Sequence, residues 1–256
     1  MPTIPNKTVR GAKPLSATYL SMLTLLALLA PLLLPSSSAE AQRAPYRDDN
    51  NRGSRHIAGE FDYYALVLSW SPTYCASRKT NRYEPQCHAK RARPYAFVLH
   101  GLWPQYTRGY PERCWTRDRP FVPRRIINDM LDIMPSPKLV IHEYKKHGTC
   151  TGLTPAGYYD LSRRMFESIK IPGPFTQPVK AQMISPEALS DAFVAANPKL
   201  RSDMIAISCG GAGNRLREIR ICFSKSGKPT PCGRNENQRR MCSAKRMFIP
   251  PVRVPR

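Results

Sequence analysis

The feature that most constrains how this chain can fold is a set of eight cysteines spread over its C-terminal two thirds. They occupy positions 75, 87, 114, 150, 209, 222, 232 and 242 of 256 residues. An even number of cysteines in an exported protein is typical of a disulfide framework. Zinc is the alternative, but no two of these cysteines have the short spacing of structural zinc knuckles. Four disulfides are expected, although eight cysteines allow about 105 pairings.

Residues 1–41 have the three parts of a secretory signal peptide. Basic residues are followed by an apolar run over residues 19–34 and by small residues that end in Ala39 and Ala41, the order typical of a cleaved signal. A transmembrane anchor of about 20 residues is the alternative, but two prolines and the Ala39-x-Ala41 pattern favour cleavage. We therefore expect a secreted or periplasmic protein with no stable membrane association after cleavage.

The chain is strongly basic, with 40 Lys and Arg against 18 Asp and Glu and a formal charge of +22. Removal of residues 1–41 would leave a charge of about +20. Hydrophobic residues make up 41% of the sequence, so a chain of this length can bury a core, and wholesale disorder is disfavoured. The charge indicates an acidic partner.

Spacing along the chain predicts a mixed fold. We expect residues 42–59 to form a flexible N-terminus and residues 60–256 a single domain. Short apolar or alternating runs predict strands, and three- and four-residue spacing predicts helices. The expected strands are 64–68, 95–99, 204–208, 216–223 and 246–249, and the expected helices are 122–134, 138–147, 155–169 and 186–196. Their irregular order favours an α+β fold over a repeated βαβ winding.

Two short segments gather unlike reactive groups. In the first, FVLHGLWPQ, His100 follows the strand expected at 95–99, and Trp103 comes three residues later. In the second, VIHEYKKHGTC, a short helix over 138–147 would end at Gly148, which suits a left-handed position after the helix. A histidine at the end of a strand can transfer protons if a partner faces it.

The second segment supplies such partners. Glu143 and His147 are four residues apart, as are His142 and Lys146, so an acid, a base and a cation lie on one side of the helix. A zinc hydrolase is a disfavoured alternative, because the zinc protease motif has histidines four apart and these are five apart, or about 140° around a helix. A surface helix with ordinary ion pairs is the remaining alternative for either segment alone. We expect no metal and no cofactor.

These groups suit the cleavage of RNA. The 2′-hydroxyl of RNA is an internal nucleophile, so a base, an acid and a cation suffice to form a cyclic phosphate. DNA lacks this hydroxyl and would be spared. An aromatic ring offers a face for an unstacked base, and the positive charge attracts the polyanion.

The two segments, HGLWP from His100 and HEYKKHGTC from His142, together resemble the active-site segments of the ribonuclease T2 family. The resemblance extends more weakly from Phe61 to Cys242. It implies an α+β fold with a central antiparallel sheet, several flanking helices and disulfide staples. It also implies a monomeric, secreted endoribonuclease that cleaves single-stranded RNA to a 2′,3′-cyclic phosphate and then, more slowly, hydrolyses this to a 3′-phosphate.

The resemblance also implies roles for individual residues. His147 corresponds to the base on the 2′-hydroxyl and His100 to the acid at the leaving oxygen, with the roles exchanged in hydrolysis. Glu143 and Lys146 correspond to the groups that stabilise the phosphorane. The implied disulfides are Cys75–Cys87, Cys114–Cys150, Cys209–Cys242 and Cys222–Cys232.

Two further residues correspond to substrate-binding positions: Trp103 to a base-stacking ring and His142 to a phosphate-binding group. The sequence departs from the family pattern at Tyr144, where tryptophan is usual, and at Gln105, where some members have an acidic residue that contacts the base. Tyr110 could help to hold the base, but its loop does not align securely, and it stays outside the expected site.

Other features carry weaker signals. The glycine-rich run 210–213 predicts a tight turn rather than a phosphate loop, because no apolar helix follows it. The basic runs 234–240 and 253–256 predict solvated faces more than specific sites. A cationic host-interaction protein that binds nucleic acid or membrane, with incidental or lost catalysis, is the alternative function, and intact His100, Glu143, Lys146 and His147 argue against it.

Overall fold

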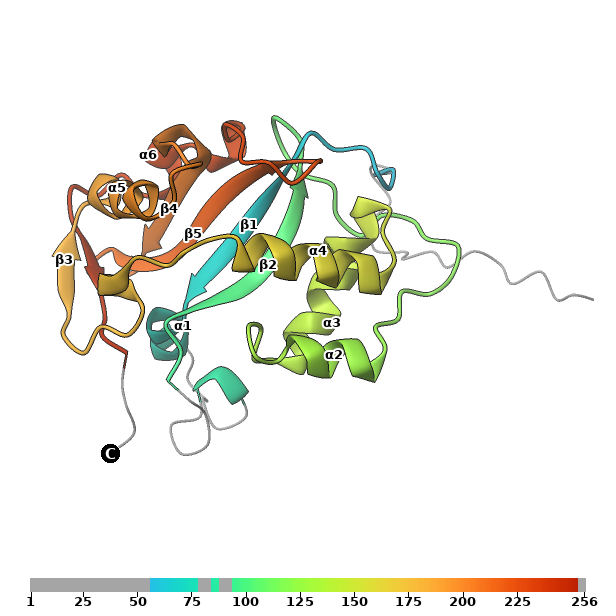
Figure 1. Cartoon of the computed structure of the whole chain (residues 1–256), viewed down its shortest axis with the longest axis horizontal. Coiled ribbons are helices and arrows are strands. Elements are labelled where there is room, and N and C mark those ends of the chain that lie inside the picture. The colour runs from blue at the N-terminus through green and yellow to red at the C-terminus, as the bar shows by residue number, and fades with distance from the viewer. Residues whose placement is uncertain (1–55, 78–83, 88–93, 253–256) are drawn as a thin grey trace, which may run out of the picture. The chain divides into compact units, whose positions relative to one another are not determined.

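The computed structural model describes residues 56–77, 84–87 and 94–252 (Figure 1). These residues belong to one compact unit, 44–256. The expected signal peptide, 1–41, and residues 42–55 lie outside the described residues. Within the described ranges, no helix is both long and apolar enough to cross a bilayer.

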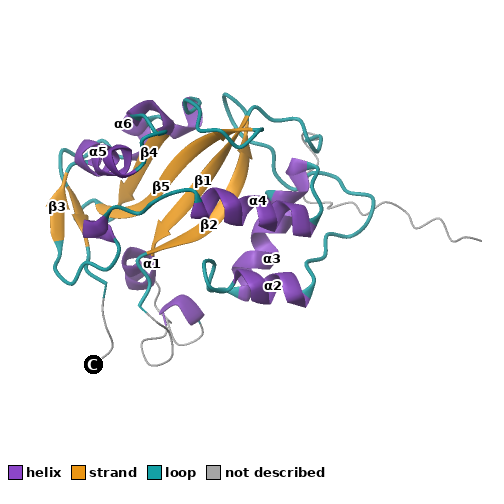
Figure 2. Ribbon diagram, in the orientation of Figure 1, coloured by secondary structure: helices purple, strands orange, loops and turns teal. Residues whose placement is uncertain are grey.

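The fold is built on a six-stranded sheet, in which β2, β1, β5, β6 and β3 lie in this order and β4 pairs with β5 (Figure 2). All pairings are antiparallel except the short contact between β5 and β6. The sheet and its helices confirm the α+β prediction. The strands are β1 (Tyr63–Trp70), β2 (Phe97–Gln105), β3 (Gln182–Ile184), β4 (Ile205–Gly210), β5 (Arg215–Ser224) and β6 (Met247–Ile249).

Helices gather in two groups on either side of the sheet, with α2, α3 and α4 beside β2 and α5 and α6 beside β4 (Figure 1). The Tyr158 hydroxyl on α4 donates to the Leu102 carbonyl at 3.0 Å, so the outer edge of β2 is covered. The helices are α1 (Ser71–Ser77), α2 (Arg124–Met130), α3 (Pro137–Lys146), α4 (Pro155–Glu167), α5 (Pro186–Ala196) and α6 (Gln238–Met241). The helix expected over 122–134 ends earlier, at Met130.

A bulge in β2 is the main departure from the expected strand. The strand continues through the histidine to Gln105, so the prediction that His100 lies beyond its end was wrong. Val67 on β1 pairs with Gly101, and Leu68 pairs with Leu99, which leaves His100 as the extra residue. Such a bulge reverses the alternation of side chains within one strand.

The bulge separates two faces of β2. Leu99 and Leu102 are both buried in the apolar core, although they are three residues apart and a regular strand would place them on opposite faces. His100 and Trp103, also three apart, lie on the other face. The alternation expected in β5 agrees with this arrangement, because Ile219 and Ile221 are fully buried and Glu218 faces the side of His100.

The end of α3 also differs from the expectation. Gly148 does not adopt a left-handed conformation, because the chain continues into a 3-10 turn, η3 (Gly148–Thr151), and the left-handed residue is Gly152. Glycine is needed at 148 for another reason: a Cβ atom there would overlap the ring of Tyr144. Tyr144 is buried and donates a hydrogen bond of 3.1 Å to the Leu153 carbonyl, so it packs as the sequence indicated.

All eight cysteines form disulfides, in the pairs that the family resemblance implies. One bridge ties the loop after β2 to the turn that follows α3. Another ties β5 to the segment before the turn η6 (Arg234–Glu236). The four pairs are Cys75–Cys87, Cys114–Cys150, Cys209–Cys242 and Cys222–Cys232.

The packing of Tyr144 on Gly148 predicts a loss of stability for Gly148→Ala. The added methyl group would displace the Tyr144 ring, and overpacking of this kind costs about 1–3 kcal/mol. Gly173→Ala is the matched control, because a Cβ atom at Gly173 meets nothing within 4 Å. Urea denaturation measures both; equal midpoints for the two variants would contradict the requirement for glycine at 148.

Candidate active site

Two elements, β2 and α3, bring the expected catalytic residues together. His100 and Trp103 come from β2, Glu143 and His147 from α3 and its C-cap, and Trp103 contacts both of these α3 residues. Gly101 allows this approach, because a Cβ atom there would overlap the Glu143 carboxylate. The sheet and the helix therefore meet at the side chains that the sequence singled out.

Trp103 is the centre of this cluster. Its indole N–H donates to Glu143 Oε2 at 2.7 Å, and its ring stacks on His147 with centroids 4.9 Å apart and planes at 21°. The His100 ring meets it edge-on at 5.1 Å, and the Arg220 guanidinium lies over it at 4.8 Å. The side chain thus contacts four neighbours and is half-buried, which limits the area available to an RNA base.

β5 adds two charged residues that the sequence analysis did not assign to the site. Glu218 Oε1 accepts a 2.6 Å hydrogen bond from His100 Nδ1, and Arg220 forms an ion pair of 3.6 Å with Glu218. On β1, which lies between β2 and β5, Ser69 pairs with Glu218 and Val67 with Arg220, so the contact between His100 and Glu218 crosses this strand. The signal was in the sequence, since both charges lie on the polar face of an alternating strand.

The surroundings of His100 favour its charged form. Burial opposes the charge, but the hydrogen bond to Glu218 and the nearby Glu143 carboxylate outweigh it and raise the pKa of His100. The other ring nitrogen, Nε2, lies 3.7 Å from Glu143 Oε1. His100 is therefore held between two carboxylates.

His147 has the opposite environment. It is 3% exposed, and its Nδ1 has no hydrogen-bond partner among the described residues. Burial, followed by the charges of Lys146 and His100, lowers the pKa of His147 to about 2. This imidazole is therefore neutral at physiological pH.

The buried Glu143 has an unusually high proton affinity. Burial raises the pKa of Glu143 to about 7, although His100 and the hydrogen bond from Trp103 oppose the shift. This carboxyl group can therefore change its protonation state near neutral pH.

The remaining expected residues lie at the edge of the cluster. Lys146 Nζ is 3.5 Å from Glu112 Oε2 and 5.9 Å from the centroid of the Tyr110 ring. His142 is exposed on α3, and burial and the charges of Lys146 and Arg113 lower its pKa. The Tyr110 ring, left outside the expected site, is 46% exposed and lies 6.3 Å from the His147 ring.

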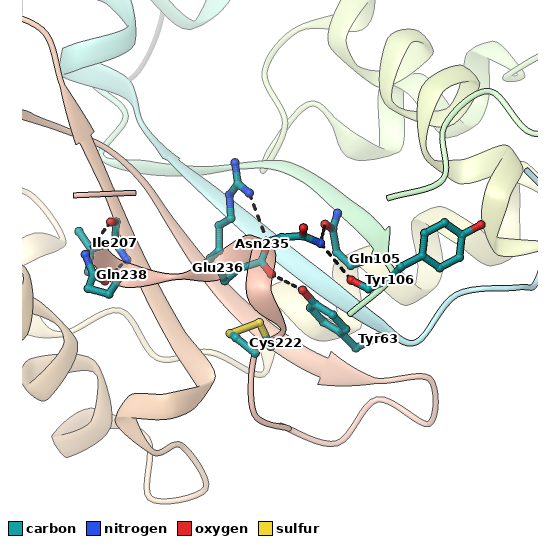
Figure 3. The surroundings of a disulfide bond; sticks show 10 residues. Tyr63, Gln105, Tyr106, Ile207, Cys222, Asn235, Glu236 and Gln238 are labelled. Carbon is teal, nitrogen blue, oxygen red and sulfur yellow. Dashed lines mark hydrogen bonds and ion pairs between the residues drawn. A yellow bond between two sulfur atoms is a disulfide. The ribbon is translucent and has the colours of Figure 1, made fainter. Parts of the chain in front are cut away.

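A turn near the C-terminus supports the loop that carries Tyr110 (Figure 3). The Asn235 amide donates to Gln105 Oε1 at 3.0 Å, to the Tyr106 carbonyl at 3.0 Å and to the Gly109 carbonyl at 2.7 Å, and its oxygen accepts from the Gly109 N–H at 2.8 Å. Gln105 itself is 2% exposed. Gln105 therefore helps to hold this loop in place and does not face the open site.

The next residue of the turn supports β5. Glu236, buried on η6, accepts hydrogen bonds from the Tyr63 hydroxyl and from Arg220 at 3.3 Å. The disulfide of Cys222 lies beside this cluster in Figure 3. A continuous set of polar contacts thus joins Glu236, through Arg220 and Glu218, to His100.

Comparison with known proteins shows the family of this chain. Residues 61–232 match the model of the Ribonuclease T2 family. The chain is 35% identical over 222 residues to a ribonuclease of Aeromonas hydrophila, an alignment that covers 86% of this chain and 93% of that protein. It is 28% identical over 247 residues to ribonuclease I of Escherichia coli, with 82% and 89% covered. The chain therefore belongs to the ribonuclease T2 family, as its motifs predicted.

Solved structures with the same fold are also ribonucleases. Trichomaglin, described as an S-like ribonuclease, superposes with a TM-score of 0.59 at 22% identity and covers 76% of this chain and 100% of its own. RNase NT, solved with 5′-AMP, gives a TM-score of 0.55 at 22% identity, with 75% and 99% covered. These comparisons confirm the fold, and the family assignment makes this chain a T2-type ribonuclease.

The opposite surroundings of the two histidines predict different titrations. His100 should titrate above, and His147 below, the ordinary imidazole pKa of about 6.5, so mildly acidic solution should contain a charged His100 beside a neutral His147. Nitrogen-15 NMR of labelled histidines across pH measures both, with assignments from His100→Ala and His147→Ala. The reverse order of titration would contradict the assignment of the two environments.

Proposed function

We propose that the protein is an endoribonuclease that cleaves single-stranded RNA by transphosphorylation to a 2′,3′-cyclic phosphate and then hydrolyses this slowly to a 3′-phosphate. The observation that carries the proposal is the pair of histidines in contact with Trp103, one held between two carboxylates and the other buried beside a lysine. Neighbouring groups whose surroundings move their pKa values apart are suited to act as acid and base. Charged His100, the form needed for the acid, and neutral His147, the form needed for the base, would be present together at mildly acidic pH.

In the first step, neutral His147 takes the proton of the 2′-hydroxyl as its oxygen attacks the phosphorus. Protonated His100 gives its proton to the departing 5′-oxygen as the P–O5′ bond breaks. The histidines exchange roles in the second step, in which water opens the cyclic phosphate. Two proton transfers and an internal nucleophile account for the reaction without a further reactant in the first step.

Charge that develops on the phosphorane needs stabilisation. Lys146, one residue from His147, supplies a cation at the edge of the cluster, and protonated Glu143 can donate a hydrogen bond to a phosphoryl oxygen. His142, exposed on the same helix, is placed to contact a neighbouring phosphate. These roles follow the expectation for the three residues.

The base on the 5′ side of the cleaved bond needs an aromatic face. Trp103 is largely occupied by protein contacts, whereas the Tyr110 ring is exposed beside His147. We therefore assign base stacking to Tyr110 together with the free part of Trp103. Buried Gln105 would influence base preference by supporting the loop rather than by direct contact.

Glu218 is assigned as a positioning residue for His100. Its hydrogen bond to Nδ1 fixes the orientation of the ring and directs Nε2 toward Glu143 and the substrate. The carboxylate also favours the protonated form that an acid needs at the start of the reaction. Arg220 holds Glu218 in turn, as the second layer of contacts behind the acid.

The proposal extends to export. Disulfides persist in oxidising compartments, and this chain forms four of them behind a signal-like N-terminus, which supports secretion or transfer to the periplasm. In that setting the charge of about +20 on the mature chain would gather RNA by long-range attraction.

The acid and base roles predict the effect of removing either histidine. His100→Ala and His147→Ala should each lower kcat by roughly a hundred-fold to ten-thousand-fold, because each removes a proton-transfer group. The measurement uses an RNA of defined sequence, with the reaction stopped at set times. The amount of product gives the rate, and mass spectrometry of the product ends shows whether a cyclic phosphate has formed. His56→Ala is the matched control, since His56 lies outside the cluster.

The proposed function would be overturned by near-normal turnover of either variant, or by wild-type products that never contain a cyclic phosphate. Loss of cleavage on chelation of metal ions would also contradict it. Circular dichroism of each variant excludes unfolding as the cause of lost activity.

The role of Glu218 predicts a shift in the pH profile. An acid loses activity as pH rises through its pKa, and Glu218→Gln removes a charge that raises the pKa of His100. The alkaline limb of kcat/KM should therefore move to lower pH, while the acidic limb stays. Asp203→Asn, which removes an exposed carboxylate, is the control. An unmoved alkaline limb in a folded Glu218→Gln protein would contradict the positioning role.

A further inference from the structure

We propose that residues 111–125, the segment between the Tyr110 loop and α2, form a binding track for single-stranded RNA beyond the cleaved bond. The inference rests on the proposed function and extends it from one phosphodiester to a longer stretch of substrate. Three observations support it: the exposed aromatic rings of this segment, its positive charge, and its bonds to the residues that follow His142 and Glu143 at the active site.

The first observation is two large aromatic side chains that are not packed into the core. Trp115 is 54% exposed and Phe121 is 72% exposed, the latter among the most exposed large hydrophobic residues described. Exposed aromatic rings of this size usually mark an interaction surface. Rings that stand in solvent can stack with unpaired bases of any sequence.

The second observation is the positive charge along the segment, between these rings and on either side of them. Five arginines of the segment are exposed, against only two acidic residues, Glu112 and Asp118. Arginines that alternate with aromatic residues provide both phosphate contacts and stacking, the combination found where proteins bind single strands. The exposed arginines are Arg113, Arg117, Arg119, Arg124 and Arg125.

The third observation is that the segment starts at the active site. The Arg113 N–H donates to the Lys146 carbonyl at 2.8 Å, and Cys114 is bonded to Cys150 at the end of the catalytic helix. From there the chain runs past α3 and α4 to the start of α2 (Figure 1). A strand of RNA that leaves the cleavage site toward Lys146 would thus meet Arg113 first and the exposed rings next.

These observations favour RNA over other occupants. A solvated surface would not expose two large rings, and a purely apolar docking face would not carry five arginines. An anionic membrane surface shares the charge and aromatic character, but continuity with the Lys146 and Tyr110 end of the active site is explained only by the substrate. Membrane binding is therefore an outcome of the test.

The test compares a long and a short substrate. Trp115→Ala combined with Phe121→Ala should raise KM for an unstructured 20-nucleotide RNA by about ten-fold or more, as expected for the loss of stacking on two bases. The kcat on that RNA, and cleavage of two nucleosides joined by one phosphate, should change by less than about two-fold. Equal KM values for the variant and the wild type on the long RNA would overturn the inference.

The role of the arginines is tested with two double variants that each remove two positive charges, one pair from the segment and one from elsewhere. Arg117→Gln combined with Arg119→Gln should weaken binding of a 20-nucleotide single-stranded DNA, which lacks the 2′-hydroxyl, and should reduce the salt dependence of that binding. Arg239→Gln combined with Arg240→Gln removes the same charge from α6, where both arginines are exposed. Equal weakening by the two pairs would show an effect of net charge and would overturn the track.

The direct probe is the fluorescence of Trp115. Trp70 is fully buried and Trp103 lies in the active site, so quenching by the DNA that is lost in Trp115→Ala reports on the track. Preferred binding of this segment to phosphatidylserine vesicles, with no quenching by DNA, would overturn the inference. Failure of the wild type to cleave either RNA would instead overturn the proposed function, while DNA binding still tests the track.

Discussion

The arrangement of the site depends on one local constraint, the bulge at His100. In a regular strand, residues three apart point to opposite faces, so either His100 or Trp103 would be turned into the apolar core. The extra residue lets Leu99 and Leu102 fill the core while His100 and Trp103 share the other face. Every contact of the indole ring, with α3 and with β5, requires this change of alternation.

Once the two faces are separated, the electrostatics follow from which side chains the neighbouring elements contribute. β5 contributes a carboxylate to His100, and α3 contributes a lysine next to His147. Two identical side chains are thereby given opposite proton affinities within one cluster. For His100 the difference arises from the strand register that places Glu218 beside it, and for His147 it arises chiefly from burial, to which the charge of Lys146 adds.

The sequence alone was sufficient for the fold class, for the two active-site segments and, through the family resemblance, for the disulfide pairs. It did not predict that β2 continues through His100, because the strand pattern breaks where the bulge reverses alternation. It also did not place Glu218 and Arg220 at the site: the alternation of β5 puts both on one polar face, but what that face meets is set by pairing with β1, which is a long-range contact. Gly148 was recognised as special, but its reason is the ring of Tyr144 rather than a left-handed backbone.

The bridge between Cys114 and Cys150 has a consequence for when the protein becomes active. It fastens the loop that carries Tyr110 to the end of the helix that carries His147, and such a bond does not persist in the reducing cytoplasm. A newly made chain would therefore lack its fully assembled site while it is still among the RNAs of its own cell. With the proposed export, oxidation outside the cytoplasm would form this bridge, so the site would be completed only after the chain has left the cytoplasm.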